Sequence, residues 1–121
     1  MNDIVSSYTR AQAIQDGILI DVSTTAREAG FRWPMAITSA AWHASIAVNK
    51  SDIGQDEQGR LWDVLSVLRY QSRDAGYEPT VYFEVLIAKG GKRPEPIRLK
   101  AHCGAGDELE PVITIMLPEE D

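Results

Sequence analysis

The sequence is poor in cysteine and histidine, the residues that form disulfide bonds and many metal sites. It has one cysteine in 121 residues, Cys103, which excludes an intramolecular disulfide and the class of disulfide-stapled domains. Neither of its two histidines, His43 and His102, has a second histidine or cysteine at metal-site spacing. His102 adjoins Cys103, and consecutive residues of a regular strand point to opposite faces, so they cannot form a nucleophile–base pair. We therefore predict no catalytic residue, no metal site and no cofactor, with Cys103 as a buried apolar residue and His43 on a helix surface.

The sequence also lacks a long apolar run. The longest segment without Asp, Glu, Lys or Arg extends from Trp33 to Asn49, contains several polar residues and is short for a membrane span. The N-terminus has no basic region followed by an apolar stretch, so it does not resemble a signal peptide. We expect a cytosolic protein with no membrane contact.

Basic residues are outnumbered. Lys and Arg total 12 against 18 Asp and Glu, which gives a net charge of -6 and argues against a general nucleic-acid binder. The hydrophobic content of 44% and the charged content of 25% are ordinary for a soluble globular chain. A chain of 121 residues fits one domain, so we predict a single domain over 1–121 with an acidic C-terminal tail over 118–121.

The first half of the sequence alternates short helices with short extended segments. Thr9 and Thr38 are suitable N-caps, and either Ser23 or Thr25 is expected to open the helix between them. The predicted order is a helix over 9–16, an extended run over 18–22, a helix over 26–29, an extended segment over 31–37 and a helix over 39–48.

The second half opens with the clearest helix, over 59–75, whose apolar stripe has three-and-four spacing. The pattern then changes to a period of two, which predicts strands over 80–89, 97–103 and 112–117. Neighbouring strands with short connections predict a three-stranded antiparallel meander, covered on one face by the long helix and the helix carrying Trp42. This is an α+β fold, in which Trp33, Trp42 and Trp62 are expected to be core residues. The stripe of the long helix comprises Leu61, Val64, Leu65 and Leu68.

Charge is segregated in the last third of the chain. An acidic stretch can imitate phosphate spacing and occupy a basic groove, although a frayed solubility tail is the simpler interpretation. The basic residues could contact nucleic acid or an acidic protein surface, although a solvated sheet face is the simpler interpretation there. The acidic candidates are Asp107, Glu108, Glu110, Glu119, Glu120 and Asp121, and the basic candidates are Lys92, Arg93, Arg98 and Lys100.

Two strings of residues give the sequence a family resemblance. The first covers residues 8–23 and 26–34, from Tyr-Thr-Arg-Ala-Gln-Ala to Phe-Arg-Trp-Pro, and the second covers residues 99–107 and 110–121. They resemble a domain-of-unknown-function family of small proteins carried by bacterial plasmids, integrative elements and phages. The resemblance implies no catalytic or binding residues.

Mobile-element carriage would favour an inhibitor of host defence, of the anti-CRISPR or antirestriction type. The hypothesis is a non-enzymatic protein that binds a CRISPR effector or restriction complex stoichiometrically through a charged surface. Two alternatives stay open. One is a regulatory or accessory module that contacts nucleic acid or protein through the basic hairpin, and the other is a small enzyme with an unrecognised site.

Overall fold

Five strands form one mixed sheet in the order β1-β2-β5-β4-β3. The computed structural model describes residues 8–48, 56–74, 76, 78–88 and 93–121. The strands are β1 (Leu19–Asp21), β2 (Met35–Thr38), β3 (Thr80–Ile87), β4 (Glu95–Ala105) and β5 (Pro111–Met116).

The predicted meander is present as β3-β4-β5, in which both neighbouring pairs are antiparallel. The sheet has five strands rather than the three of the predicted meander, because the two extended segments predicted in the first half join the same sheet. β1 pairs antiparallel with β2, and β2 pairs parallel with β5. The α+β class is confirmed. A parallel pair between distant segments leaves no local sequence signal, which is why the pattern of the strands alone did not predict it.

The helices are α1 (Arg10–Gln15), α2 (Ser23–Glu28), α3 (Ser39–Ser45) and α4 (Glu57–Gln71), and α4 is followed by the 3-10 helix η2 (Ser72–Asp74). Thr9 caps α1 and Thr38 caps α3, as predicted, because each hydroxyl accepts a backbone N–H of the first turn. Thr25 does not open α2, since it lies buried inside a helix that begins at Ser23.

The main core lies between one face of the sheet and three helices. Residues of α2, α3 and α4 pack on inward residues of β2, β3, β4 and β5, and the predicted stripe of α4 is buried throughout. Arg60 of α4 is also buried, at 2% exposure, and its guanidinium donates to the carbonyls of Ala47 and Ala88 at 2.6 Å each. This side chain ties the end of α3 and the end of β3 to α4.

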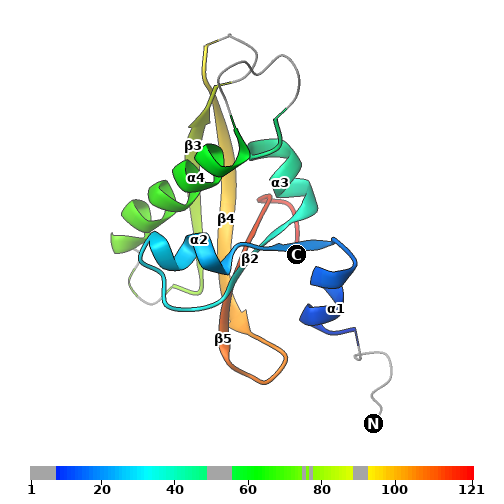
Figure 1. Ribbon diagram of the computed structural model, residues 1–121. Helices are drawn as coiled ribbons and strands as arrows, with labels where there is room; N and C mark the ends of the chain where they lie inside the picture. Colours follow the sequence, from blue (N-terminus) through cyan, green and yellow to red (C-terminus); the bar gives the residue numbers. More distant parts are fainter. Residues whose placement is uncertain (1–7, 49–55, 75, 77, 89–92) are drawn as a thin grey trace.

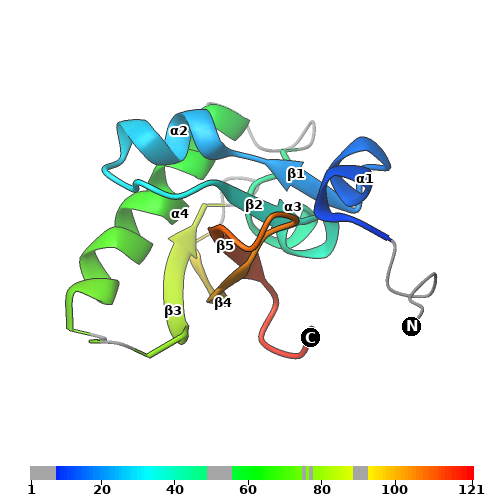
Figure 2. The same cartoon turned by 90° about the horizontal axis from the view of Figure 1, so that it is seen from below.

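α1 stands apart from the other helices, beside β1, as the view from below shows (Figure 2). Its Arg10 donates to the Thr114 hydroxyl at 2.7 Å and to the Ile113 carbonyl at 3.0 Å. The β4–β5 turn lies at the lower end of the sheet in Figure 1, and the chain end returns alongside β2. The β4–β5 turn and the C-terminal residues therefore lie at separate positions on the sheet.

Candidate binding surfaces

The β4–β5 turn brings three predicted acidic residues together. The turn closes through backbone hydrogen bonds from Gly106 to the Glu110 carbonyl at 2.6 Å and from Leu109 to the Gly106 carbonyl at 3.0 Å. The Glu110 carboxylate accepts the N–H of Glu108 at 2.9 Å. β4 continues through Gly104 and Ala105, beyond the predicted strand end at residue 103, so the turn is shorter than expected.

Leu109, at the tip of this turn, has an unusual backbone conformation. Its φ of 67° falls in the left-handed region, which costs a leucine roughly 1–2 kcal/mol. Its side chain is 83% exposed, so burial within the chain does not offset that cost. Glu108 and Glu110 flank it. The turn therefore presents an exposed apolar side chain between two acidic residues, at a strained backbone position.

The carboxylate of Asp107 makes structural hydrogen bonds within the fold. Its two carboxylate oxygens accept the backbone N–H groups of Arg10 and Ala11 at 2.7 and 3.0 Å, which fixes the turn to the start of α1. Burial lowers the pKa of the Arg10 guanidinium, while the charges of Asp107, Asp21 and Glu110 oppose that shift. The positive charge of Arg10 lies close enough to offset part of the acidity at the base of the turn.

The C-terminal acidic residues form a second, separate group. Glu120 folds back on the sheet, where its Oε1 accepts the Thr38 hydroxyl at 2.7 Å and the Leu117 N–H at 2.8 Å. The Lys100 ammonium donates to the Glu120 carbonyl. The simpler interpretation of a frayed tail is therefore wrong. Glu119 and Asp121 remain exposed.

The predicted acidic stretch is thus split by β5 into two groups, one before the strand and one after it. The turn group holds Asp107, Glu108 and Glu110, and the tail group holds Glu119, Glu120 and Asp121.

The predicted basic residues make different contacts, although Arg98 and Lys100 share one face of β4. Arg98 lies on the exposed side of β4 with its guanidinium 5.3 Å from the centre of the Tyr82 ring. Lys100 holds the tail, and Arg93 is exposed ahead of β4. Lys92 lies outside the described residues. Of this group, only Arg98 and Arg93 present exposed cations in the described part of the chain.

His102 and Cys103 point to opposite sides of β4, as the alternation predicts. The His102 ring is bonded to the Thr80 hydroxyl at 2.9 Å, whereas Cys103 lines a pocket on the other side. Cys103 is half-buried rather than fully buried. His43 is exposed on α3 and bonds to the Ser39 carbonyl at 2.8 Å. In the described residues, no group of three or more His, Cys, Asp and Glu side chains could hold a metal ion.

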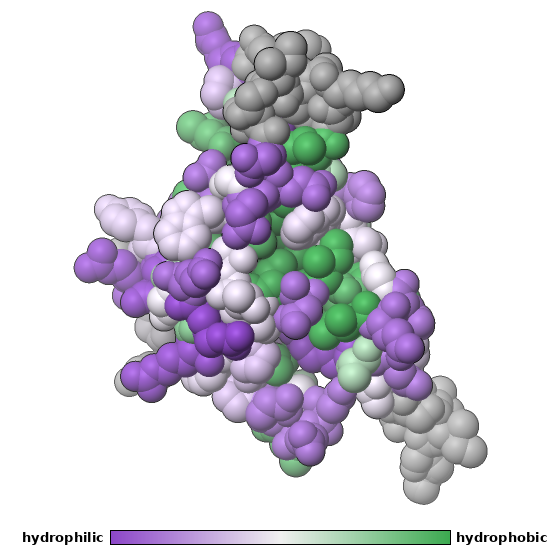
Figure 3. Space-filling view, in the orientation of Figure 1, coloured by the Kyte–Doolittle hydropathy of each residue, from purple (hydrophilic) through white to green (hydrophobic). Residues whose placement is uncertain are grey.

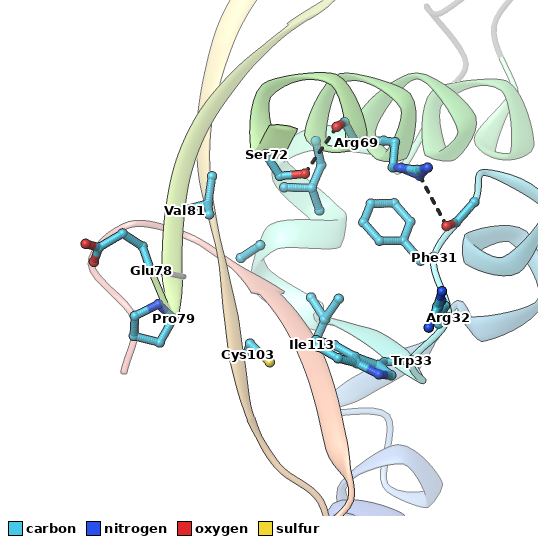
Figure 4. Close-up of a pocket in the computed structure, with 13 residues that line it drawn as sticks. Phe31, Arg32, Trp33, Arg69, Ser72, Glu78, Pro79, Val81, Cys103 and Ile113 are labelled. Carbon is cyan, nitrogen blue, oxygen red and sulfur yellow. Dashed lines mark hydrogen bonds between the residues drawn. The ribbon is translucent and has the colours of Figure 1, made fainter. Parts of the chain in front are cut away.

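A pocket of about 330 Å³ opens beside the C-terminal end of α4 (Figure 4). Phe31 and Trp33 come from the α2–β2 connection, and Val81, Cys103 and Ile113 come from the three strands of the meander. Arg32, Arg69 and Glu78 add charged groups to the lining.

The surface over α2 and α4 is mostly polar, and apolar side chains gather instead in the region of β1 (Figure 3).

Two tryptophans contradict the expectation of core positions. Trp33 is 43% exposed and Trp62 is 42% exposed, whereas Trp42 packs against the core. Trp33 lies just before Pro34 in a short connection, so no helix or strand carries it inward.

The pocket was not predicted from the sequence. Its one local signal is the string Phe31-Arg-Trp-Pro, in which two aromatic residues flank an arginine outside any periodic segment.

None of the described helices is long and apolar enough to cross a membrane. Among comparisons with known proteins, a family model described as "Family of unknown function (DUF6573)" matches residues 1–121, and the chain belongs to that family. No curated protein and no solved structure matches it. Carriage of the family by plasmids, integrative elements and phages stays a prediction of the resemblance.

Proposed function

We propose that this member of a family of unknown function is a non-enzymatic inhibitor that binds a basic groove of a host nucleic-acid-directed defence complex. The contact would be the tip of the β4–β5 turn, in the cytosol and with one inhibitor per groove. The observation that carries the proposal is Leu109, which is strained, 83% exposed and flanked by Glu108 and Glu110.

The tip combines the two elements that an inhibitor of such a groove needs. The carboxylates give long-range attraction to a basic surface and speed association. The leucine supplies an apolar anchor, which contributes roughly 1.5–3 kcal/mol when it becomes fully buried. The bonds of Asp107 to α1 hold the tip in place before binding, so little conformational entropy is lost on association.

The test is a plaquing assay in bacteria with a defined CRISPR or restriction system, together with co-purification of the chain with that system at low and high salt. Wild-type protein should raise phage plaquing and co-purify with one component, more weakly as salt rises. Leu109→Gly relieves the backbone strain, so it should fold normally while weakening binding about 30-fold, which corresponds to about 2 kcal/mol.

A matched pair of charge reversals separates the tip from the overall charge. Glu108→Lys should abolish inhibition, whereas Glu95→Lys, at the opposite end of β4, makes the same charge change away from the tip and should preserve it. Unchanged plaquing with every defence system tested, or equal loss from both variants, would contradict the proposal.

The basic-hairpin alternative has one observation in its favour, the exposed Arg98–Tyr82 pair on β3 and β4. It predicts a shift of labelled DNA or RNA at low salt that Arg98→Glu removes and Leu109→Gly does not. The inhibitor proposal predicts no such shift, because an acidic tip repels nucleic acid.

A further inference from the structure

We propose that the pocket between α4, the α2–β2 connection and the meander binds a small organic anion with an apolar body, such as an aryl-alkyl or medium-chain carboxylate. This site is separate from the β4–β5 tip, and the proposal does not depend on the inhibitory function.

The walls of the pocket select the apolar body. Phe31, Leu68, Val81 and Ile113 line it, and Figure 4 shows the Phe31 ring and the Ile113 side chain facing the same space. The volume of about 330 Å³ lies at the lower end of the range for small-molecule sites, so it suits one ring or a short chain rather than a large cofactor.

The charged side chains of the lining determine which polar group the ligand should carry. Arg32 and Arg69 lie on the side of the α2–β2 connection, and Glu78 lies across the pocket from them (Figure 4). A guanidinium binds a carboxylate through two parallel hydrogen bonds. The Glu78 carboxylate points away from the pocket in Figure 4, so the two arginines set the charge of the ligand.

Arg69 is held in position before any ligand arrives. Its Nη1 donates to the Gly30 carbonyl at 3.2 Å, which uses one of its five N–H donors, and its guanidinium lies 5.9 Å from the centre of the Phe31 ring. Gly30 has a φ of 105°, and a Cβ there would stand 2.6 Å from Arg69 Nη1. The glycine therefore permits the close approach that places the arginine at the pocket.

Four probes separate the contribution of the body from that of the charge. These are 4-phenylbutyrate, its neutral alcohol 4-phenylbutanol, its cationic amine 4-phenylbutylamine, and acetate. Binding is followed by NMR of the three tryptophan indole N–H signals, with the Trp33 signal assigned from Trp33→Phe. We expect 4-phenylbutyrate to shift the Trp33 signal, the alcohol to bind about tenfold more weakly, the amine no more tightly than the alcohol, and acetate not to bind.

Arg32→Gln tests the charge within the pocket, and Arg98→Gln, on the other face of the sheet, is the matched control. The first should reduce 4-phenylbutyrate affinity toward that of the alcohol, with the remainder of the charge effect due to Arg69, and the second should leave it unchanged. As a second measurement, 4-phenylbutyrate should slow alkylation of Cys103, the one cysteine. Equal affinities for acid and alcohol, equal effects of both variants, or no effect of any probe on Trp33 and Cys103 would overturn the proposal.

Discussion

Replacement of Glu120 by alanine should cost the protein a measurable part of its stability, although the residue lies next to the last position of the chain. Its Oε1 accepts hydrogen bonds from the Thr38 hydroxyl at 2.7 Å and from the Leu117 N–H at 2.8 Å. Hydrogen bonds to a charged acceptor contribute about 1.5–3 kcal/mol each, and partial exposure reduces that value. We expect Glu120→Ala to lower the free energy of unfolding by about 2–3 kcal/mol, and Tm by about 10 °C for a chain of this length.

Urea and thermal unfolding followed by circular dichroism measure this effect. Glu120→Gln keeps the accepting oxygen and should lose less than about 1 kcal/mol, while Glu119→Ala removes an exposed neighbour and should stay within about 0.5 kcal/mol. Because the Thr38 hydroxyl caps α3 as well as contacting Glu120, a double-mutant cycle with Thr38→Val is needed to isolate the contact, and it should give a coupling energy of about 1 kcal/mol. Equal stabilities of Glu120→Ala and Glu119→Ala would show that the C-terminal contact contributes nothing.

Three further outcomes follow from single contacts. Arg60→Ala should cost about 3 kcal/mol in urea unfolding, because it leaves two carbonyls without their charged donors and opens space in the core; a loss below about 1 kcal/mol would contradict this. The hydrogen bond from the Tyr8 hydroxyl to Asp16 raises the pKa of Tyr8, so its contribution to stability is present below pH 10.0 and is lost as pH rises through the raised pKa. Tyr8→Phe should remove from the tyrosine absorbance titration a component that titrates above pH 10.0, and loss of a component that titrates at or below pH 10.0 would refute the assignment. Gly30→Ala should destabilise by about 1–2 kcal/mol and displace Arg69, visible as weaker 4-phenylbutyrate binding, whereas wild-type affinity and stability would contradict the tight approach.

The elements with strong local patterns were predictable from the sequence. The three-and-four spacing of α4 and the alternation of β3 and β4 both predicted which residues are buried, because a half-buried helix or strand has to follow its own geometric period. The caps at Thr9 and Thr38 were equally local. The errors concern boundaries, such as the end of α3 at Ser45 rather than at residue 48, since helix ends depend on tertiary contacts.

The candidate surfaces were only partly predictable. The acidic residues were found from charge alone, but their separation into a turn group and a tail group depends on the path of β5. The backbone conformation of Leu109 and the exposure of Trp33 result from connections without periodicity, so no spacing of residues indicates them. The pocket unites residues from positions 30–33, 68–72, 78–81 and 101–113, and only the folded chain brings these segments together.

The last strand of the sheet has a consequence for how the chain is made. β5 is the centre of the strand order, and it alone connects the β1–β2 pair to the β4–β3 pair. A ribosome-bound chain ending before Pro111 would contain two unjoined pieces of sheet, each with an open edge and exposed apolar residues. The two pieces can join only after β5 has been synthesised and pairs with β2 and β4. Until β5 pairs, the open edges of both pieces can pair with other chains, so β5 protects the sheet as well as completing it.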